Sequence, residues 1–357
     1  MKRFNSFQGL RAIAFLLVFF SHCNGFLPIP SGGHGAIGVE IFIIMSGFLM
    51  EVNARDRDGS LIRQCVDCAG KKLRKFYWLH ILTMLLALVP ILLGWILELP
   101  SPQEVLETIY KIAANVLLVQ SWIPNSDYYF SLNAVTWYLS STMTMYLMFP
   151  LFDRWVPQIT KRGTKLVSIL LIFVCQLALA AGMRSSAYTR AVVYIHPLVR
   201  CMDFLVGMLL GSIYKESAES VHHRSFWTWL EAGSVGALFV VVLVFTKLPS
   251  TFSYVTLSAP AVWLLTLVFS YEGGMISRWL SWKPVVFLGN ISFELFMIHH
   301  LVIKYWEYVQ WIARRVLHHN LPGILSTVCT FVLSVAAAWL LQRIGKNLRF
   351  GTKRICK

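Results

Sequence analysis

Two ionisable side chains, Arg11 and His22, stand near the two ends of one apolar segment, "GLRAIAFLLVFFSH", at residues 9–22. Nine of the ten residues between them are apolar, and the tenth is Ser21. Charged and titratable groups inside a membrane helix are energetically unfavourable, so each of them is a hypothesis of function. An imidazole can act as a general base toward a hydroxyl nucleophile, and a guanidinium binds phosphate through its fork of donors. The pair therefore indicates acid–base chemistry at one end of a helix and anion binding at the other.

The spacing of this pair also predicts the shape of a ligand. Eleven helical steps separate Arg11 from His22, which corresponds to about 16 Å along the axis. A ligand that bridges them carries an anionic head at one face of the membrane and a reactive group on an extended arm. Acyl-coenzyme A has this shape. Snorkelling of Arg11 to lipid phosphates is the structural alternative.

Polar residues in later apolar segments are predicted to lie at the depth of His22. Counting from the outer ends of the predicted helices places Glu40, His196 and His299 in the same outer layer of the bilayer. A carboxylate beside an imidazole fixes its tautomer and raises its basicity, so we expect Glu40 to contact and orient His22. The alternative for each of these residues is hydrogen bonding between helices without a part in catalysis.

Three more charged residues lie within predicted spans. Arg200 and Asp203 are three residues apart in "HPLVRCMDFLVGMLLG", so they are predicted to pair on one helix face. The role of Glu294 in "LGNISFELFMIHH" stays open. The glycines of "GFL", "GMLLG" and "LGNIS" predict close contacts between helices, because lipid offers no hydrophobic driving force for their association.

A basic stretch at residues 53–74 is predicted to be a cytoplasmic loop. Its Lys71, Lys72 and Arg74 are candidates for binding the phosphates of acyl-coenzyme A, and lipid headgroups are the alternative anions. The stretch also contains "CVDC", a single close pair of cysteines. Without a second Cys or His pair this is a weak metal signal, so we predict no metal and no structural disulfide.

The composition excludes a soluble domain of this size. Of the 357 residues, 57% are hydrophobic and 14% are charged, and the mean hydropathy is +0.62. We predict an all-α, polytopic membrane helix bundle that forms a single domain over residues 1–357, with a core at about 4–345 and a basic cytoplasmic tail at 346–357. The predicted membrane helices cover 9–28, 35–52, 75–97, 135–152, 165–182, 191–214, 226–246, 255–271, 284–305 and 323–342.

One further segment, 105–121, carries Glu107 and Lys111 and is predicted to be a short re-entrant or interfacial helix. About ten spans then place both termini and most Lys and Arg residues on one side, which the positive-inside rule makes cytoplasmic. Most of the net charge of +15 therefore reflects basic segments on the cytoplasmic side of the membrane. A nucleic-acid partner is not needed to explain this charge, and membrane lipids are the expected partners.

Four stretches together resemble the acyltransferase 3 family of integral membrane proteins, which move acyl groups, most often acetyl, onto cell-surface glycans and related acceptors. "FQGLRAIAFLLVFFSH" is similar to the first helix of the family, with its Arg, ten residues, His spacing. "GAIGVEIFIIMSGFLM" is similar to the second helix, with Glu40 where Asp is more usual. "RCMDFLVGMLLG" and "LGNISFELFMIHH" resemble two later signatures, and the second places His299 at the family histidine. The resemblance spans residues 4 to about 345.

The resemblance implies acyl-coenzyme A as the donor substrate on the cytoplasmic side, transfer at a buried histidine, and a bacterial inner membrane as the location. It also implies a glycan or lipid-linked sugar as the acceptor. We expect His22 to be the base, Glu40 to orient it and Arg11 to bind coenzyme A phosphate. His299 is expected to serve the acceptor or the oxyanion. The acceptor, the acyl chain and the choice between direct transfer and an acyl-enzyme are left open by the sequence.

The middle of the chain departs from the family pattern. "WYLSSTMTMYL" has Thr142 and Met143 at positions where many members have two glutamates. This difference suggests a branch with a different acceptor.

Two other classes of function remain as alternatives. A secondary transporter or exporter of a lipid-linked or small sugar also needs about ten helices with buried His, Glu and Arg residues. A non-catalytic membrane sensor or assembly partner is the third class, although it would not need Arg11, His22 and Glu40 together. Release of free coenzyme A thiol in the presence of a glycan separates the enzyme from the transporter.

Overall fold

The secondary structure of the chain is helical throughout the part that the computed structural model describes, as the sequence predicts. The described residues are 2–23, 26, 34–55, 58–217, 223–245, 258–318 and 321–355. The longer helices are α1 (Asn5–His22), α2 (His34–Val52), α3 (Leu61–Leu97), α4 (Pro102–Val116), α6 (Trp137–Trp155), α7 (Arg162–Met183), α8 (Pro197–Ser217), α9 (Arg224–Phe245), α11 (Ala259–Phe269), α13 (Lys283–Asn290), α14 (Ser292–Leu317) and α15 (Gly323–Ile355). Shorter helices are α5 (Ser126–Tyr129) and α12 (Met275–Leu280), with a π-helical turn at Arg190–Ile195 before α8.

Six of the described segments are long and apolar enough to cross a membrane, so the protein is a multi-pass membrane protein. A seventh candidate is the pair α13 and α14, which are bent by 70° relative to each other. The six segments are His34–Val52, Leu61–Leu97, Arg162–Met183, Arg190–Ser217, Arg224–Val244 and Gly323–Asn347. The segment predicted to be re-entrant or interfacial forms α4, which is not among these candidates.

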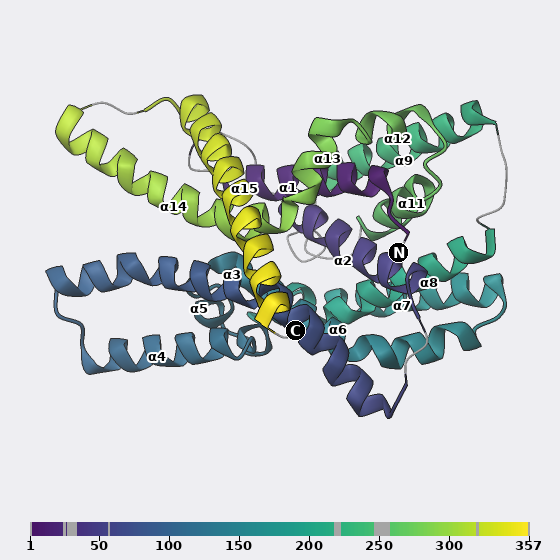
Figure 1. Cartoon of the computed structure of the whole chain (residues 1–357), viewed down its shortest axis with the longest axis horizontal. Helices are drawn as coiled ribbons and strands as arrows, with labels where there is room; N and C mark the ends of the chain where they lie inside the picture. The colour runs from purple at the N-terminus through teal and green to yellow at the C-terminus, as the bar shows by residue number, and fades with distance from the viewer. Residues whose placement is uncertain are drawn as a thin grey trace.

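The helices α1 and α2 cross the middle of the molecule (Figure 1). Two glycines show how closely α2 and α8 approach. A Cβ atom on Gly47 would lie 2.0 Å from the carbonyl oxygen of Phe204, and one on Gly207 would lie 2.1 Å from that of Ile44. Only glycine permits this approach, which confirms the predicted packing through small residues.

The beginning of α3 differs from the prediction. The helix starts at Leu61, where the Ser60 hydroxyl accepts a hydrogen bond from the backbone N–H of Arg63. The second half of the predicted loop 53–74 is therefore helical, and its lysines lie on a rigid element.

A second difference concerns the predicted helix 284–305, which is broken at Ile291 into α13 and α14. Gly289, just before the break, packs directly on the backbone of Gln8, since a Cβ there would lie 1.8 Å from the carbonyl oxygen of Gln8. The predicted end of the last helix at 342 also differs, because α15 continues to Ile355, through most of the segment 346–357. The predicted outer end of the first helix at 27–28 and the predicted helix start at 255–257 lie outside the described residues.

Candidate active site and donor cavity

A cavity of about 1160 Å³ lies between α1, α2, α3, α6 and the α13–α15 segment. We call it the inner cavity, because it lies at the Arg11 end of α1. Basic residues outnumber acidic ones in its lining, so it is suited to an anionic ligand. The basic residues are Lys2, Arg3, Arg11, Arg55, Lys71, Lys72, Lys75 and Lys346, and the acidic ones are Asp58, Asp67 and Glu294.

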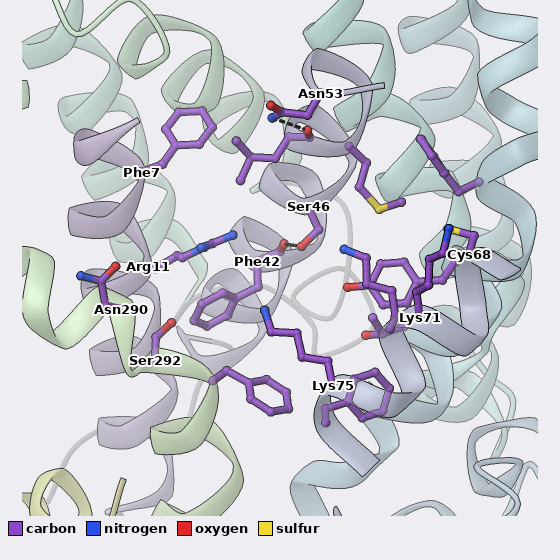
Figure 2. Close-up of a pocket in the computed structure, with 18 of the residues that line it drawn as sticks. Phe7, Arg11, Phe42, Ser46, Asn53, Cys68, Lys71, Lys75, Asn290 and Ser292 are labelled. Atoms are coloured by element: carbon purple, nitrogen blue, oxygen red, sulfur yellow. Dashed lines mark hydrogen bonds between the residues drawn. The ribbon is translucent and has the colours of Figure 1, made fainter. Parts of the chain in front are cut away.

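Figure 2 shows Arg11 of α1 and Lys75 of α3 extending into this cavity from opposite sides. The guanidinium of Arg11 donates a hydrogen bond to Gln8 Oε1 at 3.3 Å, one helical turn earlier. The candidates Lys71 and Lys72 also line the cavity. Arg74 does not line it, and its Nε donates to the carbonyl oxygen of Gly70 on its own helix at 3.3 Å.

At the other end of α1, His22 pairs with His299 of α14. His22 Nδ1 lies 2.9 Å from His299 Nε2, and the two rings stack with their centroids 5.1 Å apart. On its other side, His299 Nδ1 lies 2.9 Å from the carbonyl oxygen of Phe296 and 3.1 Å from that of Leu295.

These contacts assign the protons of the pair. A carbonyl oxygen only accepts hydrogen bonds, so Nδ1 of His299 carries a proton, and Nε2 of the neutral ring is an acceptor. His22 Nδ1 must then donate to His299, which leaves Nε2 of His22 unprotonated. This nitrogen has no hydrogen-bond partner among the described residues, and its lone pair is free to accept a proton.

His22 lines a second cavity of about 790 Å³, the outer cavity, at the His22 end of α1. His300 lines it too, and its ring lies 5.2 Å from that of His22 in an edge-to-face arrangement. His300 is not among the predicted site residues, although its position next to His299 in "IHH" could have indicated it. Aromatic and cationic side chains complete much of the wall, among them Trp137, Tyr194, Tyr305, Tyr308, Arg190 and Lys304. Aromatic faces and a few polar groups are typical of a pocket for a small organic ligand.

The predicted contact between Glu40 and His22 is not formed. Glu40 is buried and accepts a hydrogen bond from the Ser258 hydroxyl at the start of α11. The reason is the rotation of the two helices. Glu40 lies on the face of α2 that packs against α8 and α11, whereas His22 faces α14.

The predicted pairing of Arg200 and Asp203 is confirmed. Their side chains form an ion pair at 2.9 Å, and each is only 1% exposed. Arg200 also donates to the carbonyl oxygen of Val193 at 3.1 Å, and Gln176 donates to Asp203 at 2.7 Å.

The remaining predicted residues lie elsewhere. His196 packs against Trp122 with ring centroids 5.2 Å apart and does not reach the pair of His22 and His299. Glu294 and Thr142 both line the inner cavity. Within the described parts of the chain, no group of three or more His, Cys, Asp or Glu side chains is placed to hold a metal ion.

The sequence model of the acyltransferase domain family matches residues 4–343. The chain is 26% identical to the acyltransferase MdmB of Streptomyces mycarofaciens over 85% of this chain and 80% of that protein. It is 26% identical to the exopolysaccharide production protein ExoZ of Rhizobium meliloti, over 76% of this chain and 77% of the relative. Identity to the putative peptidoglycan O-acetyltransferase YrhL of Bacillus subtilis is 24% over 94% of this chain, which spans 54% of that longer protein. No solved structure matches the chain.

Proposed function

We propose a reaction for this chain, which belongs to the acyltransferase 3 family and is therefore a membrane acyltransferase. In this reaction an acyl group, acetyl in the simplest case, passes from cytoplasmic acyl-coenzyme A to a hydroxyl of a cell-envelope or exported glycan. The observation that carries the proposal is the free ring nitrogen of His22 at an outer cavity, with a basic cavity at the other end of the same helix. The names of two relatives, which refer to peptidoglycan and exopolysaccharide, support a glycan acceptor.

His22 is the general base of the proposed reaction. Its Nε2 takes the proton of the acceptor hydroxyl as the hydroxyl oxygen bonds to the thioester carbonyl carbon. The carbon–sulfur bond then breaks, and the proton passes to the coenzyme A sulfur, which leaves as the thiol. His300, whose ring touches that of His22 at the same cavity, is placed to hydrogen-bond the acceptor.

His299 is a positioning residue in this proposal. Both of its nitrogens are engaged, one with backbone carbonyls and one with His22, so it holds the tautomer of His22 and stabilises the imidazolium that forms. This replaces the expectation that Glu40 orients His22 and that His299 binds the oxyanion. Glu40 acts at a distance from the reacting atoms, by joining α2 to α11 through Ser258.

The inner cavity binds the phosphates of the donor in this proposal. Arg11, Lys71 and Lys72 keep the role expected from the sequence, and Lys75 takes the place of Arg74 because it lines the cavity and Arg74 does not. A guanidinium and several ammonium groups around one space form charge-assisted hydrogen bonds with phosphate oxygens.

The proposed topology has ten crossings in a bacterial inner membrane. The helices α1 and α6 and the short α11 join seven candidate spans, with the bent pair α13 and α14 counted as one, to make this number. Both termini then lie in the cytoplasm, where the positive-inside rule places the basic loops.

Replacement of His22 by Ala tests the proposal directly. The protein is reconstituted in lipid nanodiscs with radiolabelled acetyl-coenzyme A and a panel of soluble oligosaccharides, and both thiol release and labelled glycan are measured. His22→Ala should lower transfer by a factor of at least about 10². His196→Ala, which removes a histidine outside the pair, is the matched control and should retain activity. Full activity of His22→Ala, or no glycan-dependent thiol release from the unaltered protein, would refute the proposal.

A further inference from the structure

The inner and outer cavities meet at a single aromatic side chain, Phe296 of α14. Among the described residues it is the only one that lines both cavities. It is 4% exposed, so it is packed among its neighbours where the two cavities adjoin. A group that moved directly from the inner cavity to His22 would meet this ring.

Aromatic neighbours on two other helices surround the ring. Its centroid lies 5.1 Å from that of Tyr138 on α6 and 6.2 Å from that of Phe42 on α2. The imidazole of His299 lies 6.0 Å away on the side of the catalytic pair. The passage is therefore closed by rings from three helices, directly beside the histidines.

Two hydroxyl groups in the lining of the inner cavity stand close to these rings. Ser46 lies one helical turn from Phe42, and Thr142 lies one turn from Tyr138. Each of the two hydroxyls donates to a backbone carbonyl one turn earlier, at 2.7 and 2.6 Å. Their oxygen lone pairs remain able to accept amide N–H groups.

The same kinds of group match the parts of an acyl-coenzyme A molecule. Phosphates stand at one end and suit the basic side chains, an arm with two amides follows and suits the hydroxyls, and the acyl thioester forms the tip. Because the Phe296 ring lies beside His299, the acyl tip of a donor bound in the inner cavity would meet this ring as it approaches His22.

We propose that Phe296 determines the length of the acyl group that the enzyme transfers. The inference rests on the proposed function and goes beyond it by naming a residue for donor specificity. The ring must turn aside for the thioester to reach His22, and the space that it vacates holds a short acyl group such as acetyl. Longer chains collide with the ring and with its aromatic neighbours.

The backbone allows this movement without loss of the catalytic pair. His299 is held by the main-chain carbonyl of Phe296 at 2.9 Å and not by the ring. Rotation about the side-chain bonds of Phe296 therefore leaves that hydrogen bond unchanged. A smaller side chain at position 296 should widen the passage and keep His22 and His299 in place.

The test compares donors of increasing length on variants of position 296. Phe296→Leu and Phe296→Ala are assayed with acetyl-, hexanoyl- and decanoyl-coenzyme A, and the ratio of long-chain to acetyl transfer is measured by thiol release. We expect this ratio to rise by about tenfold or more in both variants. Phe204→Leu is the matched control, because Phe204 is also fully buried but lines neither cavity, and its ratio should equal that of the unaltered protein.

The outcomes separate this inference from the function on which it rests. An unchanged ratio in Phe296→Leu, with the variant eluting as a single species in detergent, overturns the assignment of Phe296 even if Phe296→Ala does not fold. A rise of the same size in Phe204→Leu also overturns it, because loosened packing would then be the cause. No transfer by the unaltered protein with any donor would instead refute the proposed acyl transfer itself.

Discussion

Lys75 and Arg74 are neighbours in α3, yet only Lys75 faces the inner cavity. We predict that Lys75→Ala weakens binding of acetyl-coenzyme A by roughly 10- to 150-fold, because one hydrogen bond between charged groups contributes about 1.5–3 kcal/mol. Arg74→Ala removes the same kind of charge from the adjacent position and should change the affinity little. Equilibrium binding to the protein in nanodiscs measures both. Equal losses in the two variants would show that only general surface charge matters.

Arg200 and Asp203 form the most deeply buried ion pair of the described chain, with both side chains 1% exposed. Arg200→Met leaves the carboxylate of Asp203 buried without a counter-charge, and we expect the free energy of unfolding to fall by about 3–5 kcal/mol. Unfolding in detergent under increasing dodecyl sulfate measures this loss.

Two further variants are compared with Arg200→Met. The double variant Arg200→Met, Asp203→Leu should recover part of the lost stability, because it removes both charges. Arg63→Met breaks the pair with Asp67, whose side chains are 75% and 57% exposed, and should cost less than about 1 kcal/mol. Unaltered stability of the single Arg200 variant would mean that solvent reaches the pair.

The crossing of α2 and α8 depends on the absence of side-chain atoms at two glycines. Gly207→Ala places a methyl group 2.1 Å from the carbonyl oxygen of Ile44, so the helices must separate. We predict a marked loss of folded protein, seen as aggregation in fluorescence-detected size-exclusion chromatography. Gly236→Ala is the matched control, since a Cβ on that glycine of α9 meets no atom within 4 Å. A folded Gly207→Ala protein would mean that the crossing tolerates a wider separation.

Helix positions could be predicted from the sequence where apolar runs have clear polar limits. The ends of α2 and α7 fall close to their predicted ranges. The start of α3 was missed because the basic residues before the apolar run favour a loop, whereas the Ser60 cap and good helix formers extend the helix. The break at Ile291 was missed because the approach of Gly289 to Gln8 is a contact between distant parts of the chain.

The sequence predicts the depth of the site residues in the membrane, but not the direction in which their side chains point. Counting residues along each helix places His22 and His299 in one layer, and the structure joins them. The same counting gives Glu40 a similar depth, but it does not state which way a helix is rotated, and Glu40 faces Ser258 instead. Rotation is set by packing between helices, which one sequence does not reveal.

At the scale of the whole molecule, segments from near both ends of the chain border the inner cavity. Lys2 and Arg3, just before α1, line it together with Gln342 and Lys346 of α15, and Figure 1 shows the C-terminal end of α15 near the middle of the molecule. Segments near both ends of the described chain therefore border one cavity. In the proposed topology, with both termini in the cytoplasm, this cavity opens toward the cytoplasmic face of the membrane.

This arrangement predicts from which side the donor reaches the protein. Acetyl-coenzyme A is strongly anionic and does not cross a bilayer, and basic segments are retained in the cytoplasm. Inside-out vesicles that contain the protein should therefore bind added radiolabelled acetyl-coenzyme A, whereas sealed right-side-out vesicles should bind it only after permeabilisation. Lys75→Ala vesicles are the control, because they keep the topology but lack one cavity charge, so their binding should be weaker in the inside-out form. Equal binding by intact right-side-out vesicles would place the basic cavity outside and reverse the proposed direction of transfer.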